Sequence, residues 1–119
     1  MRATRNRWYM KNLEFALYFW KGKADPQGIN DCGSKQSFTM NAKRETAHPT
    51  EKPIALADHY IRNSTNKGDT VLDPMMGSGT AMVAAMRAGR ASIGIEKSKK
   101  WFDVAVDRVR QEYNPEQGI

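Results

Sequence analysis

A run of eight residues, Asp73-Pro74-Met75-Met76-Gly77-Ser78-Gly79-Thr80, has the residue types and spacing to bind a ligand. It follows a short apolar run (70–72) that predicts a buried strand, and it precedes a run (81–86) that predicts the start of a helix. An acidic residue at a strand's end, a glycine loop and a helix N-terminus are typical of a nucleotide-type cofactor site at the carboxyl edge of a parallel sheet. Gly77 and Gly79 lack Cβ, so the backbone can turn tightly there and a ligand can approach closely.

A second apolar run, 91–95, ends in a carboxylate at Glu96. In βαβ units of this kind, such an acid accepts hydrogen bonds from ribose hydroxyls. The glycine spacing also distinguishes between cofactors. A dinucleotide-binding GxGxxG pattern would need glycine where Met82 stands, and the sequence has no GxxxxGKS phosphate loop. The pattern therefore disfavours a dinucleotide and a nucleoside triphosphate.

A third motif, His48-Pro49-Thr50-Glu51-Lys52-Pro53, lies upstream of the first predicted strand. The order HPTEKP, DPMMGSGT and GIE at this spacing resembles the β-class of DNA amino-methyltransferases, which methylate adenine N6 or cytosine N4 with S-adenosylmethionine. The resemblance runs from about Leu13 to the last predicted helix. It implies an α/β fold, a truncated Rossmann-like methyltransferase sheet with flanking helices.

The resemblance also implies a role for each motif. Glu96 would bind the ribose diol, and Asp73 would orient the methionine portion through its amino group or a water. The N–H groups around 77–80 would bind the methionine carboxylate, since a helix N-terminus favours an anion. Thr50 and Lys52 would lie over the methionine end of the cofactor, and Lys97 and Ser98 near its adenine. The full set expected at the cofactor is Thr50, Lys52, Asp73, Pro74, Met75, Gly77, Ser78, Gly79, Thr80, Glu96, Lys97 and Ser98.

The family's catalytic motif, Asp/Asn/Ser-Pro-Pro followed by an aromatic residue, does not occur in this sequence, so no catalytic residue is assigned. The segment 24–47 is also too short for the family's target-recognition region. We therefore expect this chain to be the C-terminal, cofactor-binding part of a methyltransferase and to be inactive alone. In the family, the strand with the catalytic motif lies beside the strand that ends at Asp73. Without it, that strand has a free edge, which we expect to pair with a second copy or a host protein.

The 119 residues predict a single partial domain made of a basic arm (1–12), a loop (24–47) and a cofactor-binding βαβ part (48–119). Aromatic residues in 13–20 predict a strand. A helix is expected at 54–63, with Ile54, Leu56 or Ala57, Tyr60 and Ile61 on its buried face. A last helix is expected at 99–113, capped by Ser98, with a packed stripe of Phe102, Ala105, Val106 and Val109.

The formal net charge is +6 and the pI is about 9.6, which favours an acidic partner such as DNA. Trp8 and Tyr9 stand among the N-terminal arginines, and basic residues interleaved with aromatic ones suit phosphates and stacked bases. The alternative is a solvated basic tail. The residues expected at nucleic acid are Arg2, Arg5, Arg7, Lys43 and Arg44.

Other classes of protein are disfavoured. The sequence shows no apolar run of the ~20 residues needed to span a bilayer and no evident signal peptide. Cys32 is the only cysteine, which favours a reducing cytoplasm, and it is expected to be an inert loop thiol rather than a nucleophile. No metal site is expected, because His48 and His59 have no metal spacing. His48 is expected to pack the HPTEKP turn, and His59 to face solvent.

Three functions remain open. The first is part of a DNA methyltransferase, either half of a split enzyme or a remnant. The second is a methyltransferase-like protein, of the small phage type, that binds and inhibits a partner. The third is a nucleic-acid-binding module without cofactor. Asp73, the glycine loop and Glu96 favour the first over the third.

Overall fold

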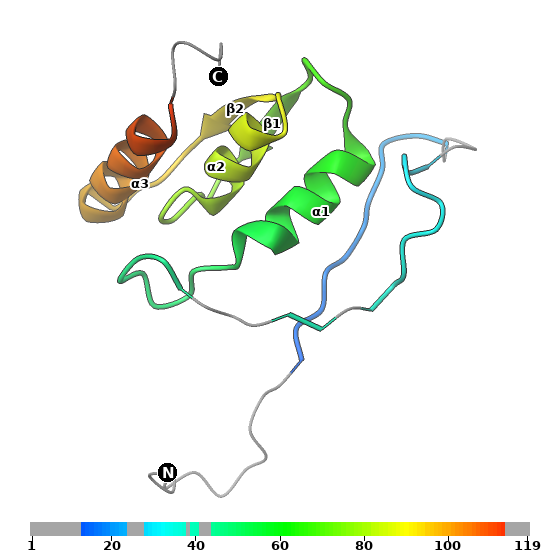
Figure 1. Cartoon of the computed structure of the whole chain (residues 1–119), viewed down its shortest axis with the longest axis horizontal. Helices are drawn as coiled ribbons and strands as arrows, with labels where there is room; N and C mark the ends of the chain where they lie inside the picture. The colour runs from blue at the N-terminus through cyan, green and yellow to red at the C-terminus, as the bar shows by residue number, and fades with distance from the viewer. Residues whose placement is uncertain (1–12, 24–27, 38, 41–43, 114–119) are drawn as a thin grey trace, which may run out of the picture.

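The computed structural model describes residues 13–23, 28–37, 39–40 and 44–113. Helices and strands alternate along this part of the chain: α1 (Ile54–Ser64), β1 (Thr70–Asp73), α2 (Thr80–Arg87), β2 (Ala91–Gly94) and α3 (Lys99–Glu112) (Figure 1). The strands are parallel, with Thr70 opposite Ala91 and Asp73 opposite Gly94. Since α2 connects them, they form the βαβ unit that the sequence predicted, and the α/β class is confirmed. None of the described helices is both long and apolar enough to cross a bilayer.

Helix α2 is the centre of the packing. It contacts both strands, and α1 and α3 lie on either side of it (Figure 1). Its small side chains allow this close approach: Val83, Ala84 and Ala85 are completely buried. Two apolar clusters result, one toward α1 around Ile61 and one toward α3 around Ala105. Burial of these side chains holds the glycine loop before α2 between the two outer helices.

Both ends of α2 depend on glycine. Gly79 precedes the helix with a φ of +80°, and Gly89 follows it with a φ of +73°. The Gly89 N–H donates to the Met86 carbonyl (3.0 Å) and the Arg90 N–H to the Ala85 carbonyl (2.8 Å). This is the Schellman pattern, which satisfies the last carbonyls of a helix. Gly89 therefore ends the helix, with its left-handed conformation just after the C-cap residue Ala88.

The buried faces of the outer helices differ in part from those predicted. In α1, Ile54, Ala57 and Ile61 pack on the core, but Tyr60 is 39% exposed. In α3, Phe102 is 43% exposed, and the buried residues are Ala105, as predicted, and Arg108, which lies outside the predicted stripe. Arg108 lies three residues after buried Ala105, so the two share the face turned toward α2.

The start of α3 also differs in detail. Ser98 occupies the N-cap position, as predicted, but its side chain makes no capping hydrogen bond. The Ser98 N–H instead donates to Glu96 Oε1 at 2.8 Å. The carboxylate of Glu96 therefore fixes the turn that leads into the helix.

The predicted strand at 13–20 is wrong. The segment has no strand conformation, and its apolar side chains are exposed, including Phe15 (91%) and Leu17 (79%). A strand requires a hydrogen-bonded neighbour, and among the described residues the sheet contains only β1 and β2. Aromatic composition alone therefore does not establish a strand.

Candidate cofactor site

An open hollow of about 380 Å³ lies where β1 ends and α2 begins. The HPTEKP turn, the start of α1 and the segment 73–81 form its wall. It is lined by His48, Thr50, Lys52, Leu56, Ala57, Asp73, Met75, Met76, Gly77, Ser78, Thr80 and Ala81. Folding therefore brings two of the three sequence motifs together around one opening.

Asp73 forms the strand side of the hollow. Its Oδ1 accepts a hydrogen bond from the Met75 N–H at 3.0 Å, which fixes the start of the loop. Gly77, further along, has a φ of +53°, a conformation that favours glycine. A Cβ there would lie 3.1 Å from His48 Nε2, so the loop and the HPTEKP turn pack without space for a larger residue.

Glu96 lies beside the loop, beyond the end of β2. Its Oε2 accepts the Gly77 N–H at 3.0 Å and its Oε1 the Ser98 N–H at 2.8 Å. These backbone hydrogen bonds, that from Ser98 first, outweigh desolvation and hold the pKa of Glu96 below its ordinary value. The carboxylate is therefore charged at neutral pH and available to accept hydroxyl donors.

Glu51 is the buried anchor of the HPTEKP turn, a role that no sequence pattern indicated. Its side chain is 1% exposed. It accepts the Glu45 N–H (2.7 Å), the Thr46 N–H (3.3 Å) and the Ser78 hydroxyl (2.9 Å), as well as the Thr46 hydroxyl. Burial by itself raises the pKa of Glu51, but these bonds and the charge of Arg108 outweigh it and lower the pKa overall.

Arg108 connects α3 to the same loop. Its guanidinium donates to the Ser78 carbonyl (3.4 Å), the Thr80 hydroxyl (3.1 Å) and Glu45 Oε2 (2.7 Å), and it lies 3.6 Å from Glu51. A buried arginine with four oxygen partners holds the loop in one conformation. In the sequence, the only signal for this role of Arg108 was an arginine on the apolar side of the last predicted helix.

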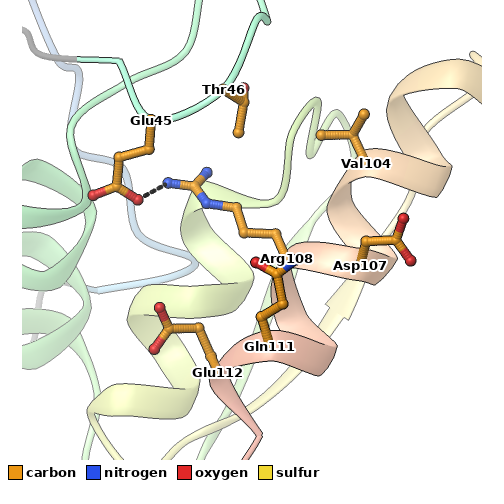
Figure 2. A pocket seen from close by; sticks show the side chains of 7 residues that line it. All are labelled: Glu45, Thr46, Val104, Asp107, Arg108, Gln111 and Glu112. Carbon is orange, nitrogen blue, oxygen red and sulfur yellow. Dashed lines mark hydrogen bonds and ion pairs between the residues drawn. The ribbon is translucent and has the colours of Figure 1, made fainter.

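Figure 2 shows the outer side of this arginine, where a second hollow of about 350 Å³ opens against α3. The Arg108 guanidinium points toward Glu45 across it. Its lining consists of Glu45, Thr46, Val104, Asp107, Arg108, Gln111 and Glu112. None of these belongs to the glycine loop, so the first hollow is the one suited to a cofactor.

His48 packs the HPTEKP turn, as predicted. Its ring contacts Trp101 edge-on at a centroid distance of 4.4 Å, and its Nδ1 accepts the Thr50 N–H at 3.3 Å. His59 is half-buried with its ring against Tyr60 rather than fully exposed. Cys32 is exposed in a loop, with its thiol 3.8 Å from the Ile29 carbonyl.

The predicted site residues fall into two groups. Those that line the hollow are Thr50, Lys52, Asp73, Met75, Gly77, Ser78 and Thr80. Those that do not line it are Pro74, Gly79, Glu96, Lys97 and Ser98. The hydroxyls in the first group are partly engaged: that of Ser78 binds Glu51, and that of Thr80 donates to the Lys52 carbonyl at 3.2 Å. The loop therefore faces the hollow mainly with backbone groups and small side chains.

The predicted nucleic-acid residues are mostly beyond the described part of the chain. Arg2, Arg5, Arg7 and Lys43 lie outside the described residues. Arg44 is exposed and donates to the Pro49 carbonyl at 3.2 Å, so it braces the HPTEKP turn.

Known proteins share these motifs and this fold. The family model N6_N4_Mtase, described as DNA methylase, matches residues 3–107. Type II methyltransferase M2.DpnII of Streptococcus pneumoniae is 46% identical over 110 residues, 88% of this chain and 41% of that protein. M2.LlaDCHI of Lactococcus lactis subsp. cremoris is 42% identical over 109 residues, 87% of this chain and 40% of that protein.

A solved structure agrees with the sequence comparisons. The crystal structure of the M1.HpyAVI–SAM complex superimposes with a TM-score of 0.61 at 36% identity, over 68% of this chain and 43% of that one. The fold is therefore that of a Rossmann-like methyltransferase. The chain belongs to the DNA methylase family, whose members methylate amino groups, and it corresponds to the C-terminal part of these relatives. It spans about 40% of the length of these relatives.

Proposed function

We propose that this chain is the S-adenosylmethionine-binding portion of a DNA adenine-N6 or cytosine-N4 methyltransferase. The observation that carries the proposal is the hollow at the end of β1, where Asp73, the glycine loop and the HPTEKP turn converge with Glu96 beside them. Support comes from M1.HpyAVI, a relative with this fold that was solved as its SAM complex.

Each group has a role that suits its chemistry. The cofactor supplies the sulfonium methyl group, and the protein binds and orients it. Glu96 accepts the ribose hydroxyls, and Asp73 accepts the methionine ammonium. N–H groups at the start of α2 face the methionine carboxylate, helped by the helix dipole. Lys52 and Thr50 close the methionine end, and Lys97 and Ser98 approach the adenine from beyond β2.

We propose that the isolated chain binds the cofactor but does not transfer its methyl group. No Asp/Asn/Ser-Pro-Pro-aromatic motif occurs in its sequence, so none of its residues is assigned to hold the amino group of a flipped base. DNA is the proposed substrate of the whole methyltransferase. The basic arm with Arg2, Arg5 and Arg7, together with Lys43 and Arg44, is proposed to contact phosphates.

A second function is a catalytically dead methyltransferase-like protein that binds and modulates a host protein. The observation that favours it is the apolar face of the two-stranded sheet, on which Leu72 is 61% and Ile93 56% exposed. In this alternative the free edge of β1 pairs with the host protein or a second copy.

Isothermal titration calorimetry with S-adenosylmethionine and S-adenosylhomocysteine distinguishes the two functions. The proposed function predicts saturable binding of one ligand per chain, weaker than micromolar because the hollow is open on one side. No heat of binding at millimolar ligand would contradict the cofactor function and favour the host-binding one. Cytidine at the same concentrations controls for weak binding of any nucleoside.

A further inference from the structure

Arg108 joins three segments of the chain behind the proposed cofactor hollow, although it does not line that hollow. Its side chain is only 9% exposed and extends inward from α3 (Figure 2). The guanidinium donates to the Ser78 carbonyl at 3.4 Å and to the Thr80 hydroxyl at 3.1 Å, where the glycine loop enters α2. It also lies 3.6 Å from Glu51 of the HPTEKP turn. One cation is therefore shared by α3 and by two walls of the hollow.

The residues that Arg108 contacts also connect these two walls to each other. The Ser78 hydroxyl donates to Glu51 at 2.9 Å, and the Thr80 hydroxyl donates to the Lys52 carbonyl at 3.2 Å. A hydroxyl has one proton and two lone pairs, so Thr80 can accept from Arg108 while it donates to Lys52. Because the guanidinium occupies a lone pair, it directs the Thr80 proton toward Lys52. The separation of the two walls therefore depends on Arg108.

The charge of Arg108 also keeps the HPTEKP turn close to the glycine loop. Glu51 is 1% exposed, and a buried carboxylate is costly without a compensating cation. Glu45, just before the turn, lies 2.7 Å from the same guanidinium. Removal of Arg108 would leave Glu51 and Glu45 without the cation that both now approach. The turn would then be expected to move away from the loop, so that one or both carboxylates reach water.

We propose that Arg108 is a positioning residue for the cofactor. It sets the separation of the glycine loop and the HPTEKP turn, and thereby the affinity for S-adenosylmethionine, without touching the cofactor. The inference rests on the proposed function, because it concerns the same site. Hydrogen bonds weaken steeply with distance and angle, so the loop N–H groups and Lys52 can bind one ligand together only when both walls are correctly placed.

Arg90 offers a matched control at the opposite ends of the same helices. It is a half-buried arginine that donates to the Thr65 hydroxyl (3.0 Å), to the Thr65 carbonyl (2.8 Å) and to the Ala88 carbonyl. Thr65 and Ala88 are the C-cap residues of α1 and α2, whereas the hollow lies where these helices begin. Replacing Arg90 therefore removes a comparable set of hydrogen bonds without reaching the hollow.

The test compares Arg108→Met with Arg90→Met at a temperature where circular dichroism shows both variants folded. Calorimetry with S-adenosylmethionine should give a Kd raised about tenfold or more by Arg108→Met and changed less than about twofold by Arg90→Met. Amide hydrogen exchange supplies a local measurement that needs no cofactor. The N–H groups of Gly79 and Glu45, one beside each end of the Arg108 bridge, should exchange about tenfold faster in Arg108→Met only.

Arg108→Lys separates charge from geometry. It keeps a cation beside Glu51, but an ammonium lacks the planar fork that reaches Ser78, Thr80 and Glu45 together. We therefore expect it to recover the melting temperature more fully than the affinity, with a Kd still about threefold or more above wild type. If Arg108→Met does not fold, this variant supplies both measurements.

Two results of the binding experiment would overturn the proposal. One is an equal rise in Kd for Arg108→Met and Arg90→Met, because any loss of stability would then weaken the site. The other is a wild-type Kd in either Arg108 variant. Absence of binding by the wild type would contradict the proposed function instead, and exchange would still decide the role of Arg108. Faster exchange at Gly79 and Glu45 would support its control of the two walls, and unchanged exchange would contradict it.

Discussion

Adjacent residues of the HPTEKP turn have opposite environments. The Glu51 side chain is buried among hydrogen-bond donors, whereas Thr50 and Lys52 face the hollow. Glu51 therefore fixes the turn, and its neighbours are placed where a ligand can reach them. Because Ser78 donates to Glu51, the same carboxylate also fixes the glycine loop. The motif thus owes its shape to one residue and its proposed binding role to two others.

Replacement of Glu51 should make stability depend less on pH. A lowered pKa means that Glu51 contributes stability above the ordinary glutamate value of about 4.3, and that this contribution is lost as the pH falls through the lower folded pKa. At pH 7, Glu51→Gln should reduce the free energy of unfolding by about 1–3 kcal/mol. The gap between wild type and variant should begin to narrow as the pH falls below about 4.3 and should close as the pH falls through the lower folded pKa. Urea denaturation at several pH values measures it.

A gap that stays constant from pH 7 to pH 3 would contradict this role for the Glu51 charge. Asp107→Asn is the matched control, because Asp107 is exposed on α3 and its ion pair with Arg110 is long, at 4.0 Å. It should change the free energy of unfolding little at any pH.

Replacement of Glu96 should weaken cofactor binding with little loss of fold. Glu96→Gln keeps the size of the side chain but removes the charge that the ribose hydroxyls would meet. We expect the Kd for S-adenosylmethionine to rise by about tenfold or more. Glu112→Gln, at the far end of α3, is the control and should leave Kd unchanged. Equal Kd values for wild type and Glu96→Gln in calorimetry would exclude the ribose role.

Sequence pattern alone marked the candidate site residues, but it did not mark the residues that hold them in place. Asp73, the glycine loop and Glu96 stand at strand ends that short apolar runs mark, so local pattern was enough. Arg108 and Glu45, by contrast, are separated by 63 positions and meet only after α3 packs on α2. No local pattern encodes such a pair, and the burial of Arg108, which lies outside the predicted apolar stripe, was therefore not predicted.

At the scale of elements, the three helices and two strands were predictable because each has its own period or its own boundary residue. Gly89 ends α2, and the apolar spacing of Ile54, Ala57 and Ile61 marks α1. The segment 13–20 was not predictable in the same way. Strand conformation depends on a neighbour at hydrogen-bonding distance, and the described part of the chain offers none to this segment.

The energetic importance of the contact between the glycine loop and α3 can be measured by comparing alanine substitutions at two glycines. Gly79 (φ +80°) and Gly68 (φ +88°) have similar backbone strain toward alanine. A Cβ at Gly79 would lie 3.0 Å from Ala105 Cβ and 3.3 Å from its Cα, whereas nothing lies within 4 Å of one at Gly68. Gly68→Ala should cost about 1–2 kcal/mol from φ alone. Gly79→Ala should cost at least about 1 kcal/mol more, because the helices must separate.

Thermal denaturation followed by circular dichroism gives both values. Equal destabilisation of the two variants would mean that α3 yields freely at Ala105, and that the close contact does not hold the loop. A larger destabilisation by Gly79→Ala would also predict weaker cofactor binding, since the N–H groups proposed to face the carboxylate lie in that loop.

For the whole molecule, the charge of +6 predicts binding to DNA mainly through phosphates. Replacing Arg2, Arg5 and Arg7 together with glutamine should flatten the plot of log affinity against log salt by about 0.9 for each phosphate that an arginine no longer neutralises. Fluorescence anisotropy with a labelled duplex of mixed sequence measures the slope. Replacing Lys99, Lys100 and Arg110 of α3 is a control of equal charge. An unchanged slope for the arginine variant would indicate a solvated tail.

The last prediction concerns activity, which depends on more of the molecule than the cofactor site. Methyl transfer needs the acceptor amino group held in line with the sulfonium, and such positioning supplies much of the rate. A base inside a duplex must also be flipped out and held, and no residue of this chain is assigned to that task. The isolated chain should therefore bind cofactor but transfer no labelled methyl group to mixed-sequence DNA. Transfer above background by the chain alone would show that its own residues hold the base.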